Sequence, residues 1–245
     1  DDADGNGISG RPNRVWSAEF EQVTLGRFGH KAGAPSVNEQ SQGAFAGDIG
    51  ISTPLNPHGW GECTEAQAEC RQAPDGNSPQ YDDREAGREV MDLVVFYAKN
   101  LAVPARRDAD DPQVLAGKRL FNGLGCSGCH VPSYTTRADA DVAAEQRGQR
   151  IWPYTDLLLH DMGEGLADRR PEGVATGTEW RTAPLWGIGL TPVVNGHDFY
   201  LHDGRARGVL EAILWHGGEA QAQRDAVVQL PKADREALIK FVESL

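Results

Sequence analysis

The chain has 245 residues and a formal net charge of −12 at pH 7, so it is long enough for one large domain or two small ones. The acidic balance excludes nucleic acid as a partner, because phosphates select basic surfaces. No apolar run approaches the length of a transmembrane helix. The 29 glycines and 14 prolines predict long ordered loops and little sheet.

The first residues alternate oxygen-bearing side chains with small residues, as a calcium-binding loop of the EF-hand type does. Asp2, Asp4 and Asn6 are the candidate ligands. The twelfth position of such a loop is Asn13, where a bidentate Glu is usual, and an acidic mobile terminus is the alternative. The chain begins at Asp1 without an initiator Met, so we expect a processed form that has lost an export signal.

The helices predicted along the chain follow from apolar spacing and capping signals. Apolar side chains recur at helical spacing over residues 83–101, namely at Val90, Leu93, Val94, Tyr97 and Leu101. A helix over 112–122 has Asp111 as its N-cap and a proline at its first position. Two further helices are predicted over 208–215 and 232–245. The apolar face of the last one is expected to pack across the helix over 112–122.

The sequence Cys-Ser-Gly-Cys-His at residues 126–130 is the attachment pattern of a c-type haem. The thiols of Cys126 and Cys129 add to the two vinyl groups of one porphyrin, and His130 then binds the iron from one face. A zinc site and a redox dithiol are the alternatives. Zinc would need further Cys or His ligands at finger-like spacing, and none follow. A dithiol would need a preceding strand and no adjacent histidine.

The two remaining cysteines, Cys63 and Cys70, flank six residues in a Pro- and Gly-rich region. Haem c attachment implies an oxidising compartment, so we expect a periplasmic or otherwise exported protein with a disulfide between these cysteines. Two free surface thiols are the alternative.

These observations predict a mainly α fold. Residues 105–245 are expected to form a cytochrome c-type haem domain with long ordered loops. Residues 1–104 are expected to form a loop-rich inter-domain region with one long helix. Pro104 ends that helix, and the polar residues 105–110 link the two parts.

Three segments downstream of the haem motif resemble motifs of bacterial di-haem cytochrome c peroxidases. They are residues 153–168 (PYTDLLLHDMGEGLAD), residues 177–191 (GTEWRTAPLWGIGLT) and residues 202–205 (HDGR). The fuller strings are more similar to the related di-haem oxidoreductase, putative peroxidase, family. The resemblance covers nearly the whole chain, which looks like the C-terminal part of such a protein.

The resemblance implies the electron-transfer half of a periplasmic peroxidase. A small donor protein would supply electrons, and a second haem would reduce hydrogen peroxide to water. A di-haem enzyme needs two C-x-x-C-H motifs and this sequence has one, so we expect the other upstream of Asp1.

Segments near the N-terminus also resemble the peroxidases, where they line the peroxide side of the second haem. They are residues 28–32 (FGHKA), 36–40 (SVNEQ) and 47–50 (GDIG). The resemblance implies that Gln40 and Asp48 are catalytic pocket residues. Asp48 is shorter than the family's glutamate, and a phenylalanine replaces the family's bridging tryptophan. Structural loop residues are the alternative.

The sixth ligand of the iron is also assigned from the resemblance. The family's distal residue lies twelve positions after His-Asp-Gly, which is His216 here, so we expect bis-histidine iron. Met162 is the alternative, because a downstream Met is the usual ligand in small cytochromes c. Arg181 and Arg205 are expected to pair with the haem propionates, the alternative being ordinary surface arginines. The other downstream histidines are expected to be structural: His160, His197 and His202.

Two other functions remain open at this point. A stand-alone mono-haem electron carrier fits the single motif and a saturated iron. A di-haem enzyme that oxidatively modifies a partner protein or an organic substrate fits the family resemblance equally well. A homodimer is one option for the assembly.

Overall fold

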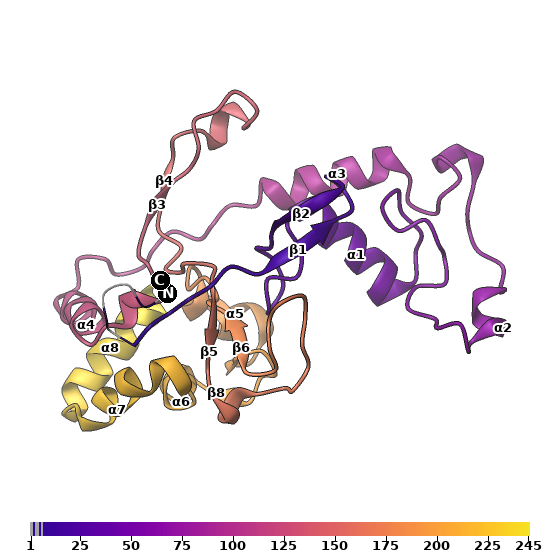
Figure 1. Cartoon of the computed structure of the whole chain (residues 1–245). Helices are drawn as coiled ribbons and strands as arrows, with labels where there is room; N and C mark the ends of the chain where they lie inside the picture. Colours follow the sequence, from indigo (N-terminus) through magenta and orange to yellow (C-terminus); the bar gives the residue numbers. More distant parts are fainter. Residues whose placement is uncertain (1, 3–4, 6) are drawn as a thin grey trace. The chain divides into compact units, whose positions relative to one another are not determined.

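The computed structural model describes residues 2, 5 and 7–245. The described chain forms two compact units, one of Asn13–Ala102 and the other of the residues up to Pro12 together with Val103–Leu245. Figure 1 shows the helices and strands of both units and labels most of them. In the part of the chain that is described, no helix is long and apolar enough to cross a membrane.

The Asn13–Ala102 unit combines a β-hairpin with two packed helices. Its elements in chain order are β1 (Arg14–Ser17), β2 (Gln22–Leu25), α1 (Val37–Ile49), α2 (Ala68–Arg71), a 3₁₀ turn (Pro79–Tyr81) and α3 (Arg88–Lys99). The two strands are antiparallel, and α1 packs against α3. Helix α1 is capped by Ser36, whose hydroxyl accepts a hydrogen bond from the Glu39 N–H and so satisfies one free donor of the first turn.

Helix α3 differs from the prediction in its start and in its buried face. It begins five residues later than expected, because Asp82 and Asp83 have φ of 60° and 55°, which a right-handed helix excludes. Met91 is its buried residue, at 1% exposure, whereas Leu93 and Tyr97 of the predicted apolar stripe are 65% and 68% exposed. Apolar spacing identified the helix but not the side that packs.

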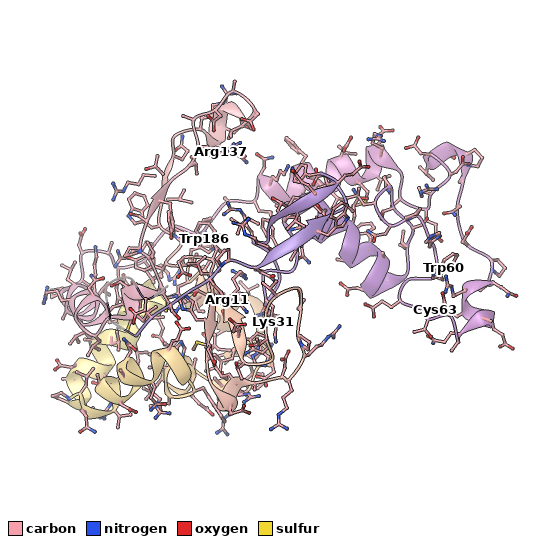
Figure 2. All side chains as sticks on the ribbon, viewed as in Figure 1. Arg11, Lys31, Trp60, Cys63, Arg137 and Trp186 are labelled. Atoms are coloured by element: carbon pink, nitrogen blue, oxygen red, sulfur yellow. A yellow bond between two sulfur atoms is a disulfide. The ribbon has the colours of Figure 1, made fainter. Side chains whose placement is uncertain are left out.

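The predicted disulfide is present in this unit. Cys63 is bonded to Cys70, which lies in α2. The N–H of Cys63 donates to the carbonyl of Trp60 at 3.1 Å, and these two residues lie side by side in Figure 2. The guanidinium of Arg71 lies 4.9 Å from the centre of the Trp60 ring. The bond therefore closes a small, locally packed loop.

The larger unit alternates helices with very short strands. Its helices are α4 (Pro112–Gly123), α5 (Thr191–Asn195), α6 (Val209–Leu214), α7 (Gln221–Gln229) and α8 (Lys232–Ser244). Its strands are β3 (Tyr134–Thr135), β4 (Arg150–Ile151), β5 (Leu159–Asp161), β6 (Glu179–Arg181), β7 (Phe199–Tyr200) and β8 (Ala206–Arg207). They pair antiparallel as β3–β4, β5–β6 and β7–β8.

The core of this unit is the crossing of α4 and α8, seen in Figure 1. Asp111 caps α4 as predicted, because its carboxylate accepts from the Gln113 and Val114 N–H groups. Gly117 lets the helices meet, since a Cβ there would overlap the carbonyl of Ala237. The buried residues at and around this crossing include Val114, Phe121, Tyr154, Leu238, Phe241, Val242 and Leu245. The predicted packing of the last helix across α4 is therefore observed.

The prediction of a mainly α fold is wrong. Among the described residues there are eight α-helices and four two-stranded antiparallel sheets, with 38% helix and 12% strand. The sheets escaped the sequence analysis because strands of two to four residues are too short to show a period of two. The prediction of a cytochrome c-type domain, which was part of the same fold assignment, is not supported by this architecture.

Candidate haem site

The Cys-x-x-Cys-His segment follows directly from α4. The helix ends at Gly123 with Leu124 as its C-cap, and Gly125 then turns the chain with φ of 85°, a conformation that favours glycine. Residues 126–128 form a 3₁₀ turn, and the N–H of His130 donates to the carbonyl of Cys126 at 3.0 Å. Because α4 packs against α8, the motif is attached directly to the buried core of the unit.

Cys126 has the environment of an inert thiol. It is half-buried and packs against the core, and burial raises its pKa to about 11. A redox dithiol needs the opposite, a thiol whose pKa is lowered so that the thiolate forms near neutral pH. The dithiol alternative is therefore disfavoured, whereas an apolar setting suits a cysteine joined to a porphyrin.

The ring of His130 is oriented by a single backbone carbonyl. Its Nδ1 lies 2.9 Å from the carbonyl oxygen of Tyr154, so Nδ1–H donates and Nε2 is left as the metal-binding atom. Burial lowers the pKa of His130 to about 4, against the Tyr154 hydrogen bond, and repulsion from His216 lowers it further. The imidazole is therefore neutral at physiological pH, which is the form that binds iron.

His216 has the same arrangement as His130. It follows α6, and its Nδ1 lies 2.7 Å from the carbonyl oxygen of Ala212, again leaving Nε2 as the metal-binding atom. Burial lowers its pKa, and a charge on His216 would disfavour a charge on His130, so both rings favour the neutral form. The residues present thus fit a haem: two thiols, and two neutral imidazoles each fixed through Nδ1.

Met162 lies next to the segment that carries His216. It lines a cavity of about 410 Å³ together with Trp215 and Gly217, and a Cβ on Gly217 would come within 2.9 Å of the Met162 carbonyl. The close backbone packing fixes the loop on which His216 sits. Whether Met162 replaces His216 as the sixth ligand stays a prediction.

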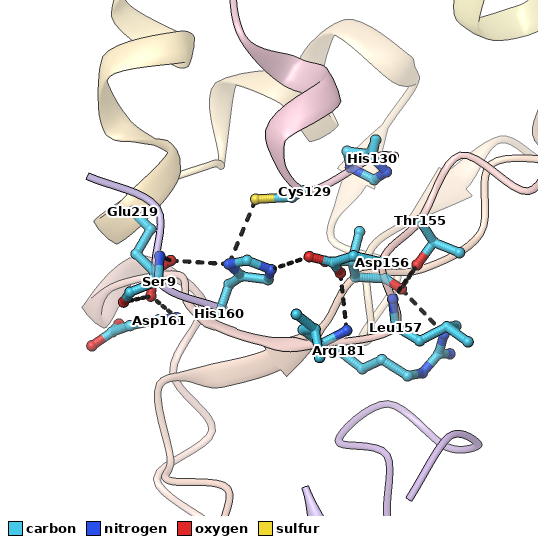
Figure 3. Close-up of polar contacts among 12 residues, drawn as sticks. Ser9, Cys129, His130, Thr155, Asp156, Leu157, His160, Asp161, Arg181 and Glu219 are labelled. Carbon is cyan, nitrogen blue, oxygen red and sulfur yellow. Dashed lines mark hydrogen bonds and ion pairs between the residues drawn. The ribbon is translucent and has the colours of Figure 1, made fainter. Parts of the chain in front are cut away.

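His160 joins two carboxylates in the interior, as Figure 3 shows. It is 2% exposed, and its Nε2 and Nδ1 lie 2.9 Å from Asp156 Oδ2 and Glu219 Oε2. The Cys129 Sγ lies 3.6 Å from the same Nδ1. Burial opposes the charged form, but the hydrogen bonds that the ring donates to Asp156, Cys129 and Glu219 outweigh it and raise the pKa of His160 to about 11.

Sequence reasoning listed His160 among the structural histidines and missed this cluster. The spacing of Asp156 and His160, four residues apart, was visible in the sequence. Glu219, which is 59 residues away, was not foreseeable from any local pattern. The cluster became apparent only once the fold placed the third residue.

The two arginines predicted to face propionates have different surroundings. Arg181 is half-buried on β6, burial lowers its pKa, and its Nη1 donates to the Thr182 carbonyl at 3.2 Å. Arg205 is ion-paired with Asp203 at 2.6 Å and lies over the Trp215 ring. The guanidinium of Arg205 is therefore already paired with a carboxylate of its own loop. Propionate pairing remains a prediction for both.

The remaining predicted site residues lie in the other unit or at the N-terminus. Gln40 and Asp48 are both exposed on α1 and stand eight residues apart, about 12 Å along a helix axis. Asp2 accepts a hydrogen bond from the Gly7 N–H, while Asp4 and Asn6 lie outside the described residues. Their catalytic and calcium-binding roles remain predictions.

No group of three or more His, Cys, Asp or Glu side chains in the described part of the chain is arranged to hold a metal ion. A haem iron needs fewer protein ligands than a bare metal ion, because the porphyrin supplies four nitrogens and the protein supplies one or two axial ligands.

The whole chain, residues 1–245, matches the family described as "Di-haem oxidoreductase, putative peroxidase". The chain belongs to this family. A family of di-haem proteins implies a haem cofactor and oxidoreductase chemistry, in agreement with the resemblance drawn from the motifs. Neither the curated proteins nor the solved structures contain a significant match.

Proposed function

We propose that Cys126 and Cys129 carry a covalently attached haem c whose iron is bound by His130 and His216. The observation that supports this most strongly is the matched pair of imidazoles. Each is neutral, and each donates Nδ1–H to a backbone carbonyl, at 2.9 Å from Tyr154 and 2.7 Å from Ala212. Such second contacts fix the ring orientation and tautomer of metal-binding histidines.

Bound haem c supplies reversible one-electron transfer at its iron. The contribution of this chain is to bind and orient that group. The carbonyl of Tyr154 makes His130 a stronger electron donor by polarising Nδ1–H, and burial keeps both rings neutral. A second histidine as axial ligand lowers the reduction potential relative to a methionine.

In this proposal the chain is the electron-transfer half of an exported, periplasmic di-haem oxidoreductase. The enzyme reduces hydrogen peroxide with electrons from a small donor protein. Membership of the di-haem oxidoreductase, putative peroxidase, family supports the reaction. An iron held by both His130 and His216 would have no open position for peroxide, which suits an electron-transfer role at this site. A stand-alone electron carrier is the second candidate, since the C-x-x-C-H motif at residues 126–130 together with two histidine ligands would suffice for electron transfer without catalysis. The third function, oxidative modification of a partner, has no separate observation in its favour.

The test is maturation of the full chain in a host that attaches haem c, followed by mass spectrometry and optical spectroscopy. One covalent haem and a low-spin spectrum are expected, and both should be lost in the double variant Cys126→Ala, Cys129→Ala. His216→Ala should keep the covalent haem but bind added cyanide or imidazole readily. His197→Ala is the matched control, because that histidine is exposed, and it should leave the spectrum unchanged. A His216→Ala spectrum identical to that of the unmodified chain would refute the assignment of the sixth ligand.

A further inference from the structure

We propose that His160 is a positioning residue that fastens the segment carrying His216 to the segment that orients His130. The inference rests on the proposed haem ligation and goes beyond it, because it assigns a role to a buried cluster that neither binds iron nor carries a thioether. Figure 3 shows His160 between its two carboxylate partners, with Cys129 nearby.

Each carboxylate partner belongs to the segment of one ligand. Asp156 follows Tyr154, whose carbonyl orients His130, by two residues, and its Oδ1 also accepts from the Leu158 N–H at 2.9 Å. Glu219 follows His216 by three residues. His160 therefore connects the two segments through two contacts of 2.9 Å each.

The Glu219 end of this connection is reinforced by backbone groups. Glu219 accepts from the N–H groups of Ser9 at 2.8 Å and of Asp161 at 3.2 Å. Immediately before it, Gly218 packs against Gly163, where a Cβ would come within 2.9 Å of the Gly218 nitrogen. The backbone after His216 is thus held at two neighbouring points, and the His160 side chain joins Glu219 to Asp156.

The chemistry of the cluster points to positioning. Both partners of the ring are carboxylates, which accept hydrogen bonds, so both ring nitrogens carry hydrogen. Burying one imidazolium and two carboxylates is costly, and well-packed apolar residues would often stabilise such a site at least as well. An ordinary structural histidine needs only one or two backbone partners. A cluster that ties together both ligand segments and touches Cys129 is better explained by geometric control of the haem site.

The experiment compares His160→Gln and Glu219→Gln with the unmodified mature chain, using His202→Gln as the matched control. His202 is also largely shielded, stacks on Trp180 and lies 3.8 Å from the carboxylate of Asp203. The first measurement is the spin state of the iron. His160→Gln is expected to convert a large share of the low-spin signal to high-spin, and added imidazole should restore it. Glu219→Gln should show a smaller change, and His202→Gln none.

The second measurement is hydrogen exchange, which does not depend on the haem. In His160→Gln the amides of residues 214–220 should exchange roughly tenfold faster, as expected when a buried hydrogen-bonded contact is removed. Amides of α4 and α8 should keep their protection. Glu219→Gln provides the same comparison if His160→Gln does not fold.

The outcomes separate this proposal from the proposed function. An unmodified chain without covalent haem overturns the haem assignment, and with it the positioning role. A haem-loaded chain whose spectrum and local exchange are the same in both variants overturns the positioning role alone. Exchange that rises equally over α4, α8 and residues 214–220 also overturns it, because that result indicates general destabilisation.

Discussion

Replacing Gly117 by Ala should separate the two helices that support the haem motif. A Cβ at this position would overlap the carbonyl of Ala237 and come within 2.6 Å of the Phe241 Cβ. The main obstacle is backbone, so no change of rotamer relieves it, and α4 must move away from α8. Forcing an extra carbon into a packed interior costs about 3 kcal/mol.

The gain in helix propensity from Gly to Ala, about 1 kcal/mol, offsets part of this cost. The net loss of unfolding free energy is therefore about 2 kcal/mol, which lowers the melting temperature of a unit of this size by roughly 4–8 °C. Circular dichroism of the mature chain during heating measures the shift. Gly123→Ala is the matched control, since it lies in the same helix and a Cβ there meets nothing within 4 Å.

The control should leave the melting temperature unchanged or raise it. The reasoning would be refuted if Gly117→Ala melted at or above the temperature of the unmodified chain. Equal losses in Gly117→Ala and Gly123→Ala would also refute it, because they would show that the α4–α8 contact is not responsible.

Two further predictions concern the electrostatics of one unit and the disulfide of the other. Arg11, by its hydrogen bonds to Glu179, lowers the pKa of this carboxyl from 4.5 to about 2. The stabilisation of the folded unit by this ion pair is present above pH 4.5 and is lost as the pH falls toward 2. Urea unfolding should show Glu179→Gln less stable by about 1–2 kcal/mol at pH 6, after screening by solvent at the 41%-exposed Arg11. If the loss of unfolding free energy in Glu179→Gln stayed constant down to pH 3, it would contradict the assignment to this ion pair. Reduction of Cys63–Cys70 should destabilise the Asn13–Ala102 unit by about 2 kcal/mol, the entropy of closing so short a loop. Hydrogen exchange of this unit with and without reductant measures the effect, and unchanged exchange would count against it.

The parts of the fold that the sequence predicts are those determined by local chemistry. Asp111 followed by a proline identifies the start of α4, because a capping carboxylate and a fixed φ act within one turn. The disulfide follows from the proximity of two cysteines. The exposed face of α3 and the short sheets were not predictable, since burial of Met91 and the pairing of β3 with β4 depend on residues distant in sequence.

In the candidate site, too, the residues set by a local pattern were predictable and the contacts between distant residues were not. The haem motif is contiguous, and His130 could be assigned from it directly. His216 was assigned from a family spacing, and its role as the sixth ligand stays a prediction. The contact of His160 with Glu219 was missed, because two oppositely charged side chains that meet only in the folded chain leave no pattern. Gln40 and Asp48 share α1 and are both exposed, and their catalytic role stays a prediction.

The most direct test of the central claim is the optical spectrum of the mature chain, oxidised and reduced, with and without hydrogen peroxide. Ligation by His130 and His216 predicts a low-spin spectrum without a methionine–sulfur band at long wavelength, unchanged by peroxide. A high-spin spectrum that shifts on addition of peroxide would show an open iron, and would contradict an electron-transfer role for this haem.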